Sequence, residues 1–156
     1  MTGVQTCALP ILASVLGSGV NADGRTNGIT APSGEAQESL IRGVLERSGV
    51  SADRVGHVVA HGTGTRLGDP VEVNALVSVF GGGSCVVSSV KPNVGHALAA
   101  SGLVSLVSLV EGMRHELIAP SILCECPSDY VDWDSAERSE ERRVGKECRS
   151  RWSPHH

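Results

Sequence analysis

The sequence predicts an α/β fold in which helices are layered on a mixed or parallel sheet. Short apolar runs at 55–60 and 85–89 alternate with segments of helical periodicity at 34–48 and 96–115, as is typical of layered α/β folds. A polar, glycine-containing turn follows each apolar run. Ligand sites gather at such turns in open α/β sheets. A chain of 156 residues suffices for one modest domain with a core.

Composition and charge exclude several classes of function. The formal net charge of −4 argues against a nucleic-acid-binding surface. The five cysteines show no regular spacing, which favours a reducing, cytoplasmic location over a disulfide framework. The longest apolar segment, 97–110, is too short and too interrupted by Ser and Gly to span a membrane, and we recognise no signal peptide. We therefore expect no nucleic-acid and no membrane partner.

Both ends of the chain look foreign to the rest. Residues 1–11 (MTGVQTCALPI) and 138–154 (RSEERRVGKECRSRWSP) resemble translations of the two short-read sequencing adapters, and such scars are set aside before the fold is considered. Six of the thirteen basic residues follow Glu137, without apolar periodicity. The native segment would then be 12–137, with fourteen acidic and seven basic residues. The alternative for 138–156, which we expect to be disordered, is a basic interaction tail.

The first native elements are a strand, a loop and a helix. Residues 12–20 mix apolar and small side chains over strand length, which predicts a buried strand. The turn formers of 21–28 predict a loop, and Pro32 keeps 29–33 extended. Ser33 is a candidate cap for a helix over 34–48. That helix would be stopped by Gly49 and would carry an apolar stripe of Leu40, Ile41, Val44 and Leu45.

A capped turn at 51–54 precedes a strand at 55–60. Asp69 and Pro70 are typical of a helix start, with Asp69 as N-cap, and predict a helix over 71–80. The glycines 81–83 break that helix, and the run 85–89 predicts a second short buried strand.

Residues 91–96 form a second polar turn at a strand end, and the most apolar helix should follow over about 96–115. Its Leu, Val and Ala residues occupy nearly every face, so we expect it to lie inside the protein. A strand or extended return is expected at 117–123, and 129–133 alternates polar and apolar residues.

The chemistry should centre on two histidines. His61 follows the first apolar run on a glycine-rich turn, and His96 occupies the second turn. Neutral imidazoles each donate one N–H, so two converging rings would make an oxyanion hole; the alternative role is general base. Lys91 would favour a neutral His96 by like-charge repulsion. Asp69 or Glu72 could hold Lys91 in place.

Other interpretations are weaker. We expect His57, on a strand, and His115, at a helix end, to be structural. A zinc site would need His57 and His61 on one helix face, with Cys124 and Cys126 as candidate further ligands, whereas the histidines flank a strand-to-turn junction. We therefore expect no metal. The glycine-rich turn also lacks the Gly-Lys-Ser/Thr ending of a phosphate loop.

Two long motifs resemble one family. Residues 59–72 (VAHGTGTRLGDPVE) resemble the first histidine motif of β-ketoacyl synthases, especially the ketosynthase domains of modular type I polyketide synthases. Residues 89–102 (SVKPNVGHALAASG) resemble their Lys/His motif. The stretches 21–32 and 120–133 are similar to neighbouring parts of that domain, so that the likeness covers nearly all of 12–135.

The resemblance implies a thiolase-like, layered α/β/α fold, of which this chain is the C-terminal half only. It also implies an acyltransferase activity, decarboxylative Claisen condensation of an acyl thioester with a malonyl-type unit on acyl carrier protein. His61, His96 and Lys91 match the family's catalytic residues, and Asp69 and Glu72 match supporting positions. The domain binds no cofactor itself; phosphopantetheine is carried by the acyl carrier protein. The parent domain is expected to be a homodimer, joined largely through its other half.

The departures from the family bear on activity. The family nucleophile is a cysteine in an Ala-Cys-Ser setting in the N-terminal half, and no cysteine of this chain has that setting. Val59 replaces the family's acidic residue, and His57 an aromatic one. Without a nucleophile no acyl-enzyme forms, so we expect this polypeptide to be inactive alone, and its uncovered apolar face to make it poorly soluble. The alternatives are a fatty-acid β-ketoacyl synthase fragment, or a non-catalytic acyl-binding or chain-length-partner module.

Overall fold

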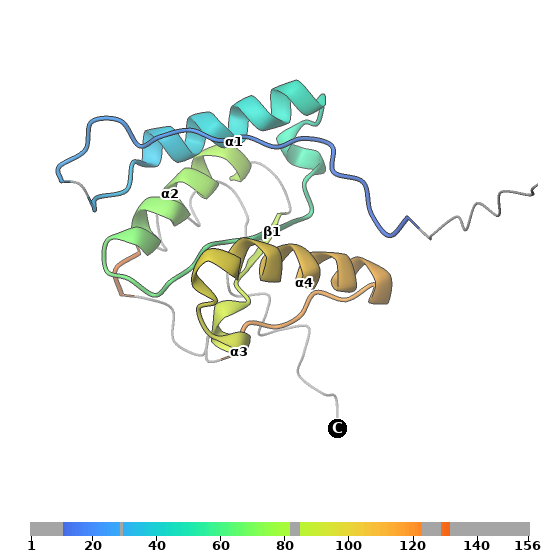
Figure 1. Ribbon diagram of the computed structural model, residues 1–156. Coiled ribbons are helices and arrows are strands. Elements are labelled where there is room, and N and C mark those ends of the chain that lie inside the picture. The colour runs from blue at the N-terminus through green and yellow to red at the C-terminus, as the bar shows by residue number, and fades with distance from the viewer. Residues whose placement is uncertain (1–10, 29, 82–84, 123–128, 132–156) are drawn as a thin grey trace, which may run out of the picture.

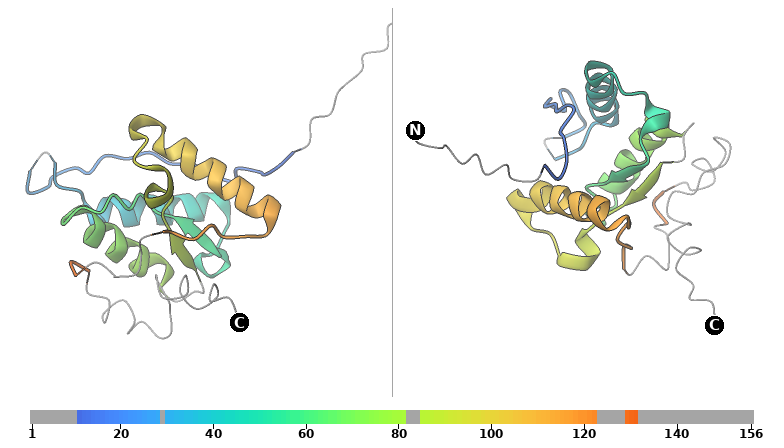
Figure 2. Two further views of the ribbon diagram at one scale, coloured as in Figure 1. Left: turned by 90° about the horizontal axis from the view of Figure 1, so that it is seen from below. Right: turned by 90° about the vertical axis from the view of Figure 1, so that its right-hand side faces the viewer.

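A computed structural model describes residues 11–28, 30–81, 85–122 and 129–131 (Figure 1). A parallel pair of short strands, β1 (His57–Val59) and β2 (Val86–Ser88), lies between two helical layers (Figures 1 and 2). Val58 and Val87 pair in register and pack on the helix α2 (Gly68–Phe80). His57 and Ser88 face the opposite layer, which is the helix α4 (Ser101–His115). The predicted α/β layering is therefore confirmed.

The helix α1 (Gly34–Ser48) agrees with its prediction at both ends. The Ser33 hydroxyl accepts a hydrogen bond from the amide of Ala36 at 3.1 Å, which satisfies one of the free N–H groups at the helix start. Gly49 ends the helix at φ 63°, in the left-handed region that favours glycine. The helix packs along α2 and contributes Ile41 and Leu45 to the core.

The helix α2 begins at Gly68, one residue before Asp69, so the prediction that Asp69 is the N-cap is wrong. The Gly68 amide donates instead to the Thr65 hydroxyl at 3.1 Å. The Asp69 carboxylate points back to the preceding loop, where it accepts hydrogen bonds from two peptide N–H groups. Leu76, Val79 and Phe80 are buried on the inner face and form the core with Cys85.

The strands are shorter than the predicted runs, because parallel pairing covers only three residues of each. The ladder is extended at both ends by single bonds, from Val86 N–H to the Gly56 carbonyl at 2.9 Å and from Ala60 N–H to the Ser88 carbonyl at 2.8 Å. The predicted turn before β1 is the short 3₁₀ helix η1 (Ala52–Arg54), but the Ser51 side chain does not cap it.

The predicted buried strand at 12–20 is wrong, because the segment is extended and exposed. It runs beside α1, as the blue trace in Figure 1 shows, and the Arg47 guanidinium donates to the Ser18 carbonyl at 3.4 Å. A Cβ built on Gly17 would collide with the Ser48 hydroxyl oxygen, so the chain lies close to the helix at this glycine. A strand also needs a sheet edge, and neither β1 nor β2 pairs with this segment. The following loop at 21–28 is confirmed.

The structure divides the predicted helix over 96–115 into two pieces, the 3₁₀ turn η2 (Leu98–Ala100) and α4, and the predicted polar turn before it contains the short helix α3 (Lys91–Val94). Gly95 at φ 80° and Leu98 at φ 47° interrupt the helical path between α3 and α4. The prediction that this helix is buried is also wrong, since α4 has no buried residue and Leu103 is 66% exposed. The side chains of α4 are apolar on nearly every face of the helix, but the other described residues pack against only one of these faces.

The chain after α4 returns extended over 117–121, as predicted; Leu123 lies outside the described residues. Tyr130 and Val131 lie in a turn and a bend, and the Val131 side chain is buried. In the part of the chain that the structure describes, no helix has the length and apolar character that crossing a membrane requires. Residues 1–10 and 132–156, which include nearly all of the adapter-like ends, lie outside the description, so that interpretation stays a prediction.

Candidate active site

His61 lies just beyond the carboxyl end of β1, at the start of the glycine-rich turn. Gly62 follows with φ +48°, and a Cβ built there would lie 3.0 Å from the Ser89 Cβ. Both the backbone angle and the close contact favour glycine at this position. The turn therefore presents the exposed imidazole of His61 at the edge of the sheet.

Glu72, on α2, holds the backbone beneath this imidazole. One carboxylate oxygen accepts from the His61 amide at 2.6 Å, and the other accepts from the Gly62 amide at 2.8 Å. Asp69 holds the next part of the turn through the amides of Gly64 at 3.1 Å and Thr65 at 3.3 Å. Such bonds between carboxylates and peptide N–H groups are charge-assisted and strong. The prediction that Asp69 or Glu72 holds Lys91 is wrong, because both carboxylates bind the turn instead.

Lys91 begins α3, directly after β2. Its ammonium nitrogen Nζ lies 3.3 Å from Nδ1 of His61 and also donates to the His61 carbonyl oxygen. We expected Lys91 to act on His96, which is nearer along the chain, whereas its ammonium makes its hydrogen bonds to His61. Because β1 and β2 are parallel neighbours, the residues just after each strand meet at the same sheet edge, whereas the chain turns away at Gly95 before it reaches His96.

His96 is oriented by its own backbone. Its Nδ1 atom accepts the N–H of Leu98 at 3.1 Å, so the neutral ring carries its hydrogen on Nε2. His61 has the same arrangement, since the Lys91 ammonium can only donate to Nδ1. In the neutral form, each ring therefore carries an Nε2–H for which the described residues provide no acceptor, so that it can bind an acceptor from outside them.

The structure brings the two histidines together. Their ring centroids lie 5.5 Å apart and their planes meet at 82°, edge to face. Both rings are exposed, so a ligand can reach the pair from solvent. Beside His61, a cavity of about 340 Å³ opens between α1 and α2, lined by Leu40, Ile41, Thr63, Glu72 and Leu76 among others. The arrangement is that of two neighbouring N–H donors, of which His61 lines a partly apolar cleft.

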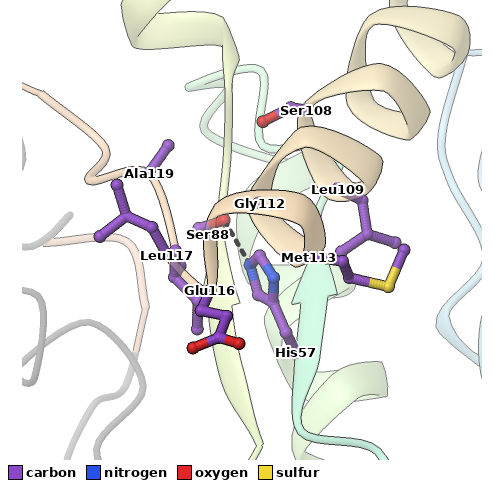
Figure 3. A pocket seen from close by; sticks show the side chains of 10 residues that line it. His57, Ser88, Ser108, Leu109, Gly112, Met113, Glu116, Leu117 and Ala119 are labelled. Atoms are coloured by element: carbon purple, nitrogen blue, oxygen red, sulfur yellow. Dashed lines mark hydrogen bonds between the residues drawn. The ribbon is translucent and has the colours of Figure 1, made fainter. Parts of the chain in front are cut away.

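His57 lies away from this pair, on the face of the sheet toward α4 (Figure 3). Its Nε2 is 2.8 Å from the Ser88 hydroxyl, and burial lowers the pKa of the ring. It lines a cavity of about 400 Å³ with Leu109 and Met113 of α4. His115 lies 3.6 Å from Glu111 at the end of α4. Both contacts agree with the structural roles that we expected.

The residues that could hold a metal are not gathered in the described part of the chain, where no group of three His, Cys, Asp or Glu converges. Cys124 and Cys126 lie outside that part. Cys85 is a free thiol buried in the core, and burial raises its pKa, so it is no nucleophile of the kind that needs a thiolate.

Sequence analysis missed Ser89 and Ser121. The Ser89 hydroxyl donates to the Gly62 carbonyl at 3.5 Å, and the Ser121 hydroxyl bonds the Ser89 backbone. The only signal for Ser89 was its place immediately before the Lys91 turn. Nothing in the sequence marked Ser121, which lies 32 residues away from its partner.

Comparison with known proteins agrees with these motifs. Residues 12–125 match the family described as beta-ketoacyl synthase, C-terminal domain. The chain is 54% identical over 121 residues to the polyketide synthase ThaG of Burkholderia thailandensis. The matched region covers 74% of this chain and 2% of ThaG. It is 46% identical over 130 residues to the erythronolide synthase EryA3 of Saccharopolyspora erythraea, covering 80% of the chain and 4% of that protein.

Solved structures show the same fold. The oxazolomycin ketosynthase domain OzmH KS7 of Streptomyces albus JA3453 superimposes with a TM-score of 0.75 at 37% identity, over 81% of this chain and 23% of that one. A ketosynthase of the bacillaene synthase from Bacillus subtilis 168 superimposes with a TM-score of 0.72 at 38% identity, over 76% of this chain and 22% of that one. The thiolase-like prediction is thus confirmed, and these relatives do not favour the fatty-acid alternative. The chain belongs to the family of β-ketoacyl synthase C-terminal domains, as found in the ketosynthases of modular polyketide synthases.

Proposed function

We propose that this chain supplies the part of a polyketide synthase ketosynthase that binds the oxygen of the extender thioester. The observation that supports this role is the pair of His61 and His96, whose rings lie 5.5 Å apart and whose Nδ1 atoms both accept hydrogen bonds. Each neutral ring then offers its Nε2–H to one acceptor. Two such donors stabilise negative charge that develops on an oxygen between them.

The proposed reaction is a decarboxylative Claisen condensation. A malonyl-type unit, attached through phosphopantetheine to an acyl carrier protein, breaks its bond to the carboxylate and releases CO2. The electron pair moves into the thioester carbonyl and leaves an enolate, whose oxygen the two N–H groups bind. The enolate carbon attacks an acyl thioester on a cysteine, a new carbon–carbon bond forms and the cysteine thiolate leaves.

Lys91 would support this role in two ways. Its ammonium holds Nδ1 of His61 and so fixes the tautomer in which Nε2 is the donor. Its ammonium also donates to the His61 carbonyl oxygen, so the same side chain holds both the ring and the backbone of His61. The general-base alternative is less well supported, because a base needs a free lone pair and the Nδ1 lone pair of each ring is already occupied.

The cysteine must come from elsewhere, because none in this sequence has the Ala-Cys-Ser setting. The matched region spans 22–23% of the solved ketosynthase chains. The remaining part of a ketosynthase, an acyl carrier protein and a second copy of the whole domain are therefore the proposed partners, in the cytoplasm. The isolated polypeptide would not elongate a chain.

A chimera tests the proposal. Residues 12–125 of this chain would replace the corresponding segment of OzmH KS7, and the rest of that ketosynthase would be kept. We expect the chimera to release CO2 from malonyl-acyl carrier protein, and the variants His61→Ala and His96→Ala to lose this activity while they unfold at the same temperature as the parent. A chimera that folds and releases CO2 equally well with both histidines replaced would overturn the proposal.

A further inference from the structure

The Ser121 side chain makes an unusual pair of bonds to one residue. Its hydroxyl oxygen accepts the N–H of Ser89 at 3.0 Å, and the same hydroxyl donates to the Ser89 carbonyl at 3.0 Å. The Ser121 hydroxyl therefore satisfies both backbone groups of Ser89, as a neighbouring strand does for a residue in a sheet. Both residues are half-buried, so these backbone groups are costly to leave without partners.

Asn93 adds a second attachment between the same two segments. Its side-chain amide nitrogen donates to the Pro120 carbonyl at 2.9 Å, and its amide oxygen accepts the N–H of Ile122 at 3.5 Å. We call this set of bonds made by Ser121 and Asn93 the clasp. It fastens the extended return at 120–122 to the segment that runs from the end of β2 into α3.

The clasped segment also positions Lys91. The Ser89 hydroxyl accepts the N–H of Lys91 at 3.4 Å and donates to the Gly62 carbonyl at 3.5 Å. Ser89 thus touches both the turn that presents His61 and the residue whose ammonium binds His61. A continuous path of contacts joins Ser121 to Ser89, Ser89 to Lys91 and Lys91 to Nδ1 of His61.

We propose that Ser121 is a positioning residue for the reaction, acting through Ser89 and Lys91 to fix His61 as an Nε2–H donor. This inference rests on the proposed function of the histidine pair. Ser121 touches no reacting atom, and His96 is oriented separately by Leu98. Loss of the Ser121 hydroxyl should therefore disturb His61 and leave His96 unchanged.

Nitrogen NMR of the histidine rings tests this independently of activity. The full 156-residue chain, labelled with ¹⁵N-histidine, would be sedimented and measured by magic-angle spinning, so that association of the chain does not matter. In Ser121→Ala we expect the Nδ1 signal of His61 to move toward the average of the two neutral tautomers, with His96 unchanged. Ser121→Thr, which keeps the hydroxyl, should show the Nδ1 signal of His61 at its parental position. Ser51→Ala is the matched control, since the Ser51 side chain caps nothing.

An unchanged His61 signal in Ser121→Ala would overturn the proposal, and so would an equal change at His61 and His96, which would indicate general loosening. If Ser121→Ala does not fold, Asn93→Ala weakens the same clasp from its other side and is judged by the same two criteria.

The chimera then separates this inference from the proposed function. Ser121→Ala should lower kcat for CO2 release about tenfold with little change in KM, the loss typical of one neutral hydrogen bond in a positioning chain. Added to Lys91→Met it should cause no further loss, because both changes interrupt one path. A full additional loss in the double variant would overturn the path through Lys91. Inactivity of every chimera would count against the proposed function alone, because the NMR result stands without it.

Discussion

The ammonium of Lys91 lies 3.3 Å from Nδ1 of His61, although the two residues are 30 positions apart in the sequence. The contact exists because β1 and β2 are parallel and adjacent, so that each strand delivers its following turn to the same edge. His96, only five positions after Lys91, reaches the same place by another route, around the bend at Gly95. The sheet thus brings His61 and Lys91 together, and the irregular turn at Gly95 brings His96 to them.

The contact between Lys91 and His61 should require both the charge and the compact shape of the lysine ammonium. In the chimera, Lys91→Met should lower the rate of CO2 release by about 100-fold, in the range seen when one preorganised electrostatic contact is lost. Lys91→Arg should not restore it, because a planar guanidinium cannot occupy the position of a compact ammonium. Arg54→Met, at an exposed position, is the control. Full activity of Lys91→Met would contradict the assigned contact.

Glu72 makes a prediction about stability. Glu72→Gln removes one of two oxygens that accept the amides of His61 and Gly62, and it places an NH2 group against an N–H. We expect the free energy of unfolding of the chimera to fall by about 1–3 kcal/mol, measured by urea denaturation. Glu46→Gln, on the exposed side of α1, should have little effect. Equal midpoints for both variants would show that the two bonds contribute nothing.

His57 should make stability depend on pH. Burial lowers its pKa below the ordinary value of 6.5, so the unfolded chain binds this proton more readily than the folded chain does. This contribution is complete above the unfolded pKa and is lost as the pH falls toward the folded one. The groups lining its cavity from β2 and from α4 and the residues after it include Ser88, Ser108 and Glu116.

We therefore expect the urea midpoint of the chimera to decrease between about pH 7.5 and pH 5, and this decrease to be smaller in His57→Gln. Both proteins are measured at both pH values, so that the carboxylates they share cancel. Equal decreases in the two proteins would exclude His57 as a source of the pH dependence.

The exposed side of α4 should drive association of the isolated chain. Leu103 and Val107 are 66% and 61% exposed, and Leu98 just before the helix is 75% exposed. Apolar surface of this kind favours aggregation when nothing covers it. We expect sedimentation velocity to show oligomers at micromolar concentrations, and the double variant Leu103→Lys, Val107→Lys to reduce them. A monomeric chain with a single cooperative unfolding transition would contradict this expectation.

The adapter-like ends make a prediction about the parent gene. Genomic DNA read upstream of the codon for Leu12 should not encode residues 1–11, and it should encode an Ala-Cys-Ser segment farther upstream, in the N-terminal half of the domain. A genomic sequence that continues with the residues printed here would contradict it.

Local signals predicted the parts of the fold that depend on local physics. Ser33 and Gly49 bound α1 as expected, because a cap and a left-handed glycine act within a few residues. The two apolar runs became β1 and β2, and the turns after them carry the site. The two larger failures are nonlocal: the segment 12–20 needed a strand to pair with, and burial of α4 needed a second surface on its outer side. The N-cap of α2 was a local failure, because the Asp69 carboxylate accepts amides of the preceding turn instead of capping the helix.

The candidate site shows the same division. His61, His96 and Lys91 were predicted to lie together, and they do, because each follows a recognisable strand or turn. Which histidine Lys91 contacts could not be predicted, since sequence proximity pointed to His96 and strand pairing decided for His61. The contact between Ser121 and Ser89 joins segments separated by a whole helix, and only the folded arrangement reveals it.

If two neutral imidazoles bind one oxygen, the rate of CO2 release from malonyl-acyl carrier protein by the chimera must depend on both rings. We predict that His61→Ala and His96→Ala each lower this rate by about 100- to 1,000-fold, as expected for one lost oxyanion donor. His115→Ala, at the far end of α4, should leave the rate unchanged. If either active-site variant keeps the parental rate while it remains folded, the two rings do not act on a common oxygen.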